Sequence, residues 1–157
     1  MIAEEYDEQY RPLSSIPKGT SMFHIISAIK KSPAGFRVAL TNPKVKKPLN
    51  ENKFTQIFVE QINVLLLEAQ LPILAQNQYS DIFLGTKGIP DFYFHKVEKG
   101  STSEPLFVVE AKILPTPPPK SREKEYVVGL NKNGGIERFK LEKHGKGMSE
   151  CGMVGFL

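Results

Sequence analysis

Apolar residues recur every three to four positions between residues 51 and 70, which is the spacing of an amphipathic helix. Asn50 stands just before this run, and its side chain can cap the free backbone N–H groups at a helix start. Pro72 follows the run and is expected to stop the helix. The pattern predicts a helix over residues 51–70, with a buried stripe at positions 54, 57, 58, 62, 65, 66 and 69.

Two later segments, 89–97 and 106–114, are rich in the β-branched and aromatic residues that favour strands. The residues between them include Gly, Ser, Thr and Pro, which favour a turn near Gly100. We therefore predict that the two segments form a hairpin. In that register Asp91 lies opposite Glu110 or the residue after it, and facing Cβ atoms of an antiparallel pair are about 4.5–5.5 Å apart.

Further elements follow from the same patterns. We expect a short helix at 20–31 and a first strand at 78–84. A second helix, 134–145, has glycine at each end, and the apolar residues 151–157 predict a final strand. Residues 1–19 show no recurrent pattern and are predicted to form an extended arm.

Composition limits the classes of protein to which the chain can belong. At 157 residues, 24% of them charged and 40% hydrophobic, it is predicted to be one globular domain, with an arm and short helix over 1–49 and a core over 50–157. No apolar run approaches the roughly 20 residues of a membrane span, and the acidic N-terminus is unlike a signal peptide. A single cysteine, Cys151, excludes an internal disulfide and a cysteine-rich zinc site. These features predict a cytoplasmic protein without a membrane partner.

The formal net charge of +4 favours a polyanionic partner. Positive side chains concentrate at 44–47, 120–124 and 138–146. The last two segments follow the predicted hairpin, where contacts with a phosphate backbone would be useful. The candidates for nucleic-acid contacts are Lys120, Arg122, Arg138 and Lys140. A solvated helix face explains Lys140 equally well, whereas Arg138 has apolar neighbours and is the favoured contact.

The predicted hairpin carries the candidate chemistry. Glu110 and Lys112 interrupt an apolar segment and project from one strand face, while Ala111 points to the other. Ionised groups in apolar surroundings are costly unless they are paired or bind a metal. An ordinary surface ion pair could explain Glu110 and Lys112, and a turn could explain the Asp that follows Pro90. The predicted hairpin register, however, brings Asp91 and the Glu110–Lys112 pair to the same place. We therefore predict a site of two carboxylates and one amine, completed by Asp91.

Pro90-Asp91 followed by Glu110-Ala111-Lys112 resembles the signature of the PD-(D/E)xK nucleases, the restriction-endonuclease-like superfamily. The predicted order α, β, β, β, α, β over residues 50–157 is similar to the core of that superfamily. The resemblance implies an α/β (α+β) fold with a central mixed four-stranded sheet flanked by helices. The segment from Tyr126 to Leu157 also resembles small nucleases found with prokaryotic phage-defence systems. Because the final predicted strand reaches residue 157, we expect further helices of a longer relative, or a partner chain, to complete the fold.

The resemblance implies that Asp91, Glu110 and Lys112 are the catalytic residues of a metal-dependent endonuclease. It also implies that Asp91, Glu110 and the backbone carbonyl of Ala111 hold the metal. Mg²⁺ is the expected ion, with Mn²⁺ as a substitute, because Mg²⁺ prefers oxygen ligands and is typically held by one or two carboxylates.

Many of these nucleases place a further acid on the first helix, and this chain offers Glu51 and Glu60. A rotation of about 100° per residue puts Glu51 on the apolar stripe and Glu60 nearly opposite. Glu51 is therefore the candidate for an additional metal ligand. An acid in a first turn also complements the helix dipole, and this second explanation stays open.

The function implied by the resemblance is hydrolysis of DNA phosphodiester bonds in restriction or anti-phage defence. The expected partners are double-stranded DNA and a second copy of the chain or a larger defence complex. The alternative is a catalytically silent DNA-binding or assembly subunit with the same fold. Residues 114–120 are proline-rich and resemble an SH3-type ligand, which would suit a metal-free interaction domain, but a stiff connection is the favoured explanation.

Overall fold

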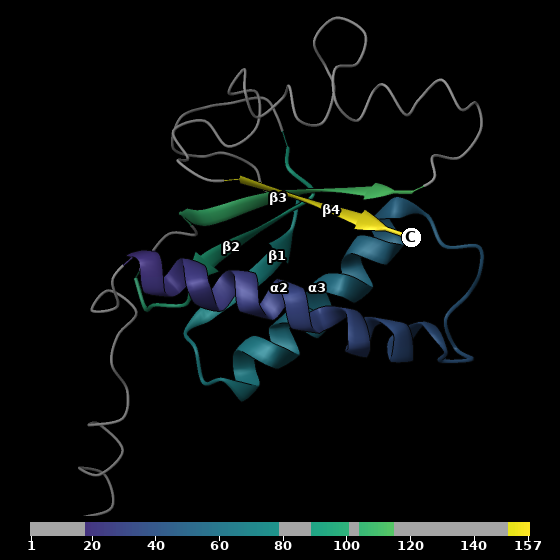
Figure 1. Cartoon of the computed structure of the whole chain (residues 1–157), viewed down its shortest axis with the longest axis horizontal. Coiled ribbons are helices and arrows are strands. Elements are labelled where there is room, and N and C mark those ends of the chain that lie inside the picture. The colour runs from purple at the N-terminus through teal and green to yellow at the C-terminus, as the bar shows by residue number, and fades with distance from the viewer. Residues whose placement is uncertain (1–17, 79–88, 101–103, 115–150) are drawn as a thin grey trace, which may run out of the picture.

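The computed structural model describes residues 18–78, 89–100, 104–114 and 151–157, which form a layer of two helices on one face of a four-stranded sheet (Figure 1). The elements are α2 (Lys18–Leu40), α3 (Glu51–Glu68), β1 (Ile73–Asn77), β2 (Phe92–Lys96), β3 (Pro105–Ile113) and β4 (Cys151–Phe156). The fold is mixed α+β, which agrees with the predicted fold class. Neither α2 nor α3 combines the length and apolar character needed to cross a membrane.

The strands lie in the order β1-β2-β3-β4. β2 is antiparallel to both of its neighbours, whereas β4 runs parallel to β3, so the sheet is mixed. The predicted hairpin and the predicted final strand are confirmed as β2–β3 and β4. Phe92 pairs with Val109, which places the preceding residue, Asp91, beside Glu110, as the register prediction required. The predicted second helix, 134–145, lies outside the described residues.

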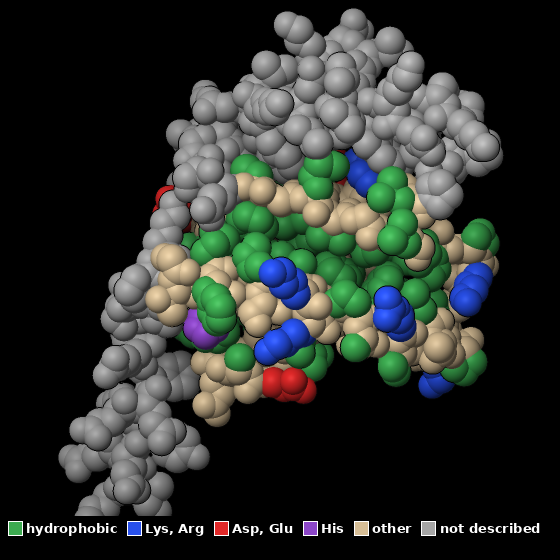
Figure 2. Space-filling view, viewed as in Figure 1, with side chains coloured by type: hydrophobic (Ala, Val, Ile, Leu, Met, Phe, Trp, Pro, Cys, Tyr) green, Lys and Arg blue, Asp and Glu red, His purple; other side chains and the backbone are tan. Residues whose placement is uncertain are grey.

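The core lies between the sheet and the helix layer because alternate strand residues face the helices. The buried strand residues on this face include Phe92, Phe94, Phe107, Val109 and Ala111. Four more phenylalanines, Phe36, Phe54, Phe58 and Phe156, contact one another with ring centroids 5.4–6.1 Å apart. Figure 2 shows apolar side chains gathered between α2 and the strands. This aromatic cluster joins β4 to both helices.

α3 confirms the predicted helix and its cap, although it ends at Glu68 rather than at residue 70. The Asn50 side-chain oxygen accepts a hydrogen bond from the Lys53 N–H at 2.9 Å. At the other end, Gln70 adopts a left-handed φ of 54°. The N–H groups of residues 70 and 71 donate back to helix carbonyls at 2.9 and 3.0 Å. This Schellman ending closes the helix before Pro72 is reached.

The first strand lies at Ile73–Asn77, so the prediction of a strand at 78–84 is wrong in position, and residues 79–84 lie outside the described part of the chain. The Asn63 side chain fixes β1 against α3, because it binds the Ala75 N–H at 2.8 Å and the Ala75 carbonyl at 2.9 Å. Gln78 then takes a left-handed φ of 53°, which ends the extended backbone.

α2 is longer than the helix predicted at 20–31 and contains Pro33. A proline lacks the N–H that would donate to the carbonyl four residues earlier, which here belongs to Ile29. The Ser32 hydroxyl donates to that carbonyl instead, at 2.7 Å. Because the carbonyl is satisfied, the helix continues to Leu40.

Gly152 of β4 provides a test of the packing between β4 and β3. A Cβ added there would lie 2.8 Å from Cζ of Phe107, whose side chain is buried in the core. We expect Gly152→Ala to lower the free energy of unfolding by about 1–3 kcal/mol, measured by urea denaturation. Gly19→Ala is the matched control, because nothing lies within 4 Å of its added Cβ and alanine favours the helix. Equal stability of the two variants would contradict this packing.

Candidate functional site

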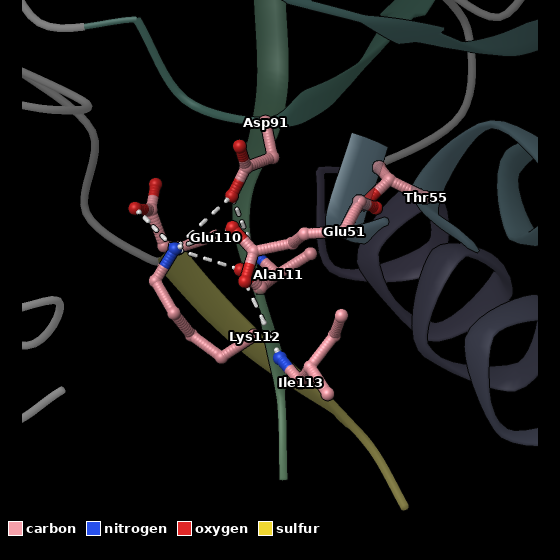
Figure 3. A network of polar contacts seen from close by, with 7 residues as sticks. All are labelled: Glu51, Thr55, Asp91, Glu110, Ala111, Lys112 and Ile113. Atoms are coloured by element: carbon pink, nitrogen blue, oxygen red, sulfur yellow. Dashed lines mark hydrogen bonds and ion pairs between the residues drawn. The ribbon is translucent and has the colours of Figure 1, made fainter. Parts of the chain in front are cut away.

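The site forms where β2 begins, β3 nears its end and α3 begins (Figure 3). Asp91 lies immediately before β2, and Glu110 and Lys112 lie on one face of β3. Glu51 reaches the same place from the first turn of α3. Segments far apart in the sequence thus bring three carboxylates and one ammonium together.

The Lys112 ammonium is the centre of this arrangement. Its Nζ lies 3.1 Å from Oε1 of Glu110, 3.2 Å from Oε1 of Glu51 and 3.7 Å from Oδ2 of Asp91. It also donates a hydrogen bond to the carbonyl oxygen of Ala111 at 2.8 Å. We call these four oxygens, one each from Asp91, Glu110, Glu51 and Ala111, the oxygen cage. A single positive charge therefore has oxygen ligands from four residues.

Backbone N–H groups of β3 hold two of the carboxylates in place. Asp91 Oδ2 accepts a hydrogen bond from the Ala111 N–H at 2.7 Å. Glu51 Oε2 accepts one from the Ile113 N–H at 3.3 Å. The two bonds fix the approach of β2 and α3 to the same stretch of β3, so the oxygen cage is built into the fold. Sequence patterns carry no signal for either bond.

The site is shielded from solvent to different degrees. The Glu110 side chain is 2% exposed and Lys112 is 15% exposed, whereas Asp91 and Glu51 are 23% and 33% exposed. An approaching ligand would therefore meet Asp91 and Glu51 first and Glu110 last. Burial of this much charge is costly without partners, and a strand with only a structural role would carry apolar side chains here.

The protonation of the site follows from burial and from the neighbouring charges. Burial raises the pKa of the Asp91 carboxyl above its ordinary value, and the Glu110 carboxylate raises it further. The Ala111 N–H and Lys112 oppose that rise only in part. Burial alone would lower the pKa of Lys112, but the three carboxylates outweigh it and the pKa is raised. Lys112 is therefore a cation, and it cannot accept a proton in this arrangement.

The oxygen cage has the donor chemistry of a magnesium site. As the side chains stand, no three His, Cys, Asp or Glu side chains in the described ranges are spaced to hold a metal ion. The Lys112 ammonium lies among the carboxylates and is the cation that they bind. Carboxylate and carbonyl oxygens are the ligands that Mg²⁺ prefers, so the residues fit this ion once Lys112 moves aside.

The structure separates the two acids of α3 that the sequence offered. Glu51 belongs to the oxygen cage, whereas Glu60 is exposed and accepts a hydrogen bond from Gln56 Nε2 at 3.1 Å. The predicted orientation of the two acids is confirmed. The other predicted contacts, Lys120, Arg122, Arg138 and Lys140, lie outside the described residues.

His95 is buried beside Tyr93 and does not reach the oxygen cage. Its Nδ1 lies 2.7 Å from the Lys96 carbonyl and therefore carries the proton. Its Nε2 is buried without a hydrogen-bond partner in the part of the chain that the structure describes. The ring stacks on Tyr93 with centroids 5.4 Å apart. These contacts hold the His95 ring against Tyr93, on the sheet and apart from the oxygen cage.

Comparison with known proteins does not assign the chain to a family. A scan against protein-family models and searches of curated proteins and solved structures found no match to the chain.

Proposed function

We propose that the protein is a divalent-metal-dependent endonuclease that hydrolyses the phosphodiester bonds of DNA. The observation that carries the proposal is the convergence of four oxygens on one cation position, with a protonated lysine at the same place. The resemblance of Pro90-Asp91 and Glu110-Ala111-Lys112 to the PD-(D/E)xK signature supports the same chemistry.

Each group of the oxygen cage has a role in this proposal. Asp91, Glu110 and the Ala111 carbonyl would hold Mg²⁺, or Mn²⁺ in its place, and Glu51 is the additional ligand. A divalent ion bound there supplies Lewis-acid polarisation of the phosphate and a nucleophilic water at neutral pH. Glu110 is the deepest ligand and Asp91 is oriented by the Ala111 N–H.

Lys112 supplies a positive charge to the substrate. A lysine ammonium is ordinarily protonated at neutral pH, so it suits neutralising the charge that develops on the phosphate oxygens or positioning the attacking water. Both roles require the ammonium to turn from the carboxylates toward the substrate. A lysine side chain on a strand end has the rotatable bonds for such a movement.

The proposed substrate is double-stranded DNA, in restriction or anti-phage defence in the cytoplasm of a prokaryote. The formal net charge of +4 favours a polyanion. With one site in each chain, a homodimer or a larger defence complex would cut both strands most simply.

A catalytically silent DNA-binding or assembly subunit is the second candidate. It is favoured by one observation, that the Lys112 ammonium already pairs with the carboxylates that a metal would bind. The two candidates differ in whether a divalent ion converts DNA binding into cleavage.

Cleavage of supercoiled plasmid DNA tests the proposal. We expect the protein to nick or cut the plasmid in Mg²⁺ and to lose this activity in EDTA. Glu110→Gln should lower the rate about 100-fold or more, because it removes the charge of the deepest ligand. Glu60→Gln is the matched control, since it makes the same change on the exposed face of α3 and should cut normally.

Two results would count against the proposal. Unchanged cleavage by the Glu110→Gln variant would contradict the assigned site. DNA binding without cleavage in any divalent metal would favour the silent subunit.

A further inference from the structure

The oxygen cage alone is not expected to bind a nucleic acid well, because its net charge is negative. Its three carboxylates together with the Lys112 ammonium carry a formal excess of two negative charges when the acids are ionised. A phosphate backbone approaching this point is repelled until a divalent cation is bound. A nuclease with this site needs positive charge beside it to hold the substrate.

The loop that joins α2 to α3 carries such charge. Lys44, Lys46 and Lys47, which we call the basic loop, are all exposed. None of the three forms an ion pair with an acid in the described residues. Three neighbouring ammonium groups that have no anionic partner in the part of the chain the structure describes form a concentrated positive surface that suits phosphates.

The backbone of this loop is held by hydrogen bonds. The side-chain oxygen of Asn42 accepts a hydrogen bond from the Lys44 N–H at 3.0 Å. The backbone carbonyl of Asn42 accepts one from the Val45 N–H at 3.0 Å. The Thr41 hydroxyl and N–H both bind the Val38 carbonyl, at 2.7 and 3.0 Å. Lys44 is therefore presented on an ordered turn, which lowers the entropy lost when it binds a ligand.

The basic loop also lies next to the site. Lys47 is four residues before Glu51, so their Cα atoms are at most about 14 Å apart. Figure 1 shows the loop running up to the start of α3 at the side of the molecule where β4 ends. Lys and Arg side chains are visible on that side in Figure 2. Glu51, the one acid close by in sequence, is occupied by Lys112 and the Ile113 N–H.

We propose that Lys44, Lys46 and Lys47 form a phosphate-contact surface that anchors the DNA backbone beside the oxygen cage. This inference rests on the proposed function for the identity of the polyanion. The anchored strand would be held next to Glu51 and Asp91, the two more exposed members of the oxygen cage. The contacts are to phosphate, so they hold the strand in place without reading its sequence.

Salt-dependent binding tests the inference. The full chain is titrated against a short fluorescein-labelled DNA duplex in EDTA, where no cleavage is expected, and anisotropy is followed at several NaCl concentrations. Loss of one phosphate contact lowers the slope of log K against log salt by about 0.9. We expect Lys46→Ala with Lys47→Ala to lower the slope by about 2 and to weaken binding about 10-fold or more at low salt.

The control is Lys30→Ala with Lys31→Ala, which removes the same charge from exposed lysines in the middle of α2. It should keep a slope within about 0.5 of the unmodified protein. Equal losses in the two double variants, or unchanged binding by the loop variant, would overturn the inference. So would the absence of DNA binding by the unmodified protein at low salt.

The outcome is independent of cleavage. If the loop variant alone loses affinity but the unmodified protein never cuts DNA in Mg²⁺, the basic loop stands as a DNA-binding surface and the proposed nuclease function fails. If the protein cuts DNA and the loop variant binds as the unmodified protein does, the nuclease function stands and the basic loop is excluded.

Discussion

Asp91→Asn is expected to abolish DNA cleavage while leaving the metal-free protein at least as stable as the unmodified one. An asparagine oxygen can still accept the hydrogen bond from the Ala111 N–H, which holds Asp91 at 2.7 Å. The substitution removes the charge of a proposed metal ligand, so we expect the cleavage rate to fall about 1,000-fold or more. Both effects can be measured on the same sample, because cleavage reports the lost ligand and thermal unfolding reports whether the fold is preserved.

The sign of the stability change follows from the pKa of Asp91. Burial and the Glu110 carboxylate raise this pKa above 3.8 in the folded protein, so the folded state binds the proton more tightly than the unfolded state does. Ionisation of Asp91 therefore costs stability, and the cost grows as the pH rises from about 3.8 through the folded-state pKa. Asparagine has no such cost.

Thermal unfolding in EDTA over a range of pH measures this difference. The Asp91→Asn variant should match the unmodified protein in acid, where Asp91 is protonated in both states, and should equal or exceed it at neutral pH. Addition of Mg²⁺ should stabilise the unmodified protein and have little effect on the variant. A variant that is clearly less stable at neutral pH, or that is stabilised equally by Mg²⁺, would contradict the assigned role of Asp91.

Lys112→Met should have a large effect on stability as well as on activity. The methionine has a similar shape but leaves three carboxylates and the Ala111 carbonyl without their shared cation. Removing one partner of a buried ion pair typically costs about 3–5 kcal/mol. We expect a loss of that order in urea denaturation in EDTA, together with a loss of cleavage of about 100-fold or more.

A divalent ion should reverse the loss of stability but not the loss of cleavage. In the unmodified protein the ion has to displace the ammonium from the oxygen cage, whereas in the variant the cage is free of it. Mg²⁺ or Mn²⁺ should therefore raise the unfolding temperature of Lys112→Met by more than that of the unmodified protein. Lys96→Met in β2 is the matched control and should respond as the unmodified protein does. A smaller shift in Lys112→Met than in the control would show that the ion binds elsewhere.

The hairpin and the candidate site could be predicted because their signals are local. Alternation in β2 and β3 determines which side chains share a face, and the turn near Gly100 determines the register. Those two facts place Asp91 near Glu110, and a register shift between Phe94 and His95, which the sequence pattern does not reveal, completes the pairing. The placement of Glu51 followed from the apolar stripe of α3 in the same way.

Other features had no readable signal because single tertiary or side-chain bonds decide them. β1 is positioned by the Asn63 side chain, and it ends where Gln78 takes a left-handed conformation that glutamine rarely adopts. α2 passes through Pro33 because the Ser32 hydroxyl replaces the missing donor. The position of the Lys112 ammonium depends on side chains from β3, α3 and the start of β2. Patterns within one segment or one hairpin could therefore not predict it.

The central claim is that Asp91, Glu110 and the Ala111 carbonyl bind one divalent cation in place of the Lys112 ammonium. A crystal structure of the full chain grown with Mn²⁺ tests this most directly, because the anomalous signal of manganese identifies the ion. The account predicts a single peak within about 2.0–2.4 Å of Asp91 and Glu110 oxygens, with Lys112 turned away from them. Lys112 still bound among the carboxylates, with manganese absent from the oxygen cage or bound elsewhere, would contradict it.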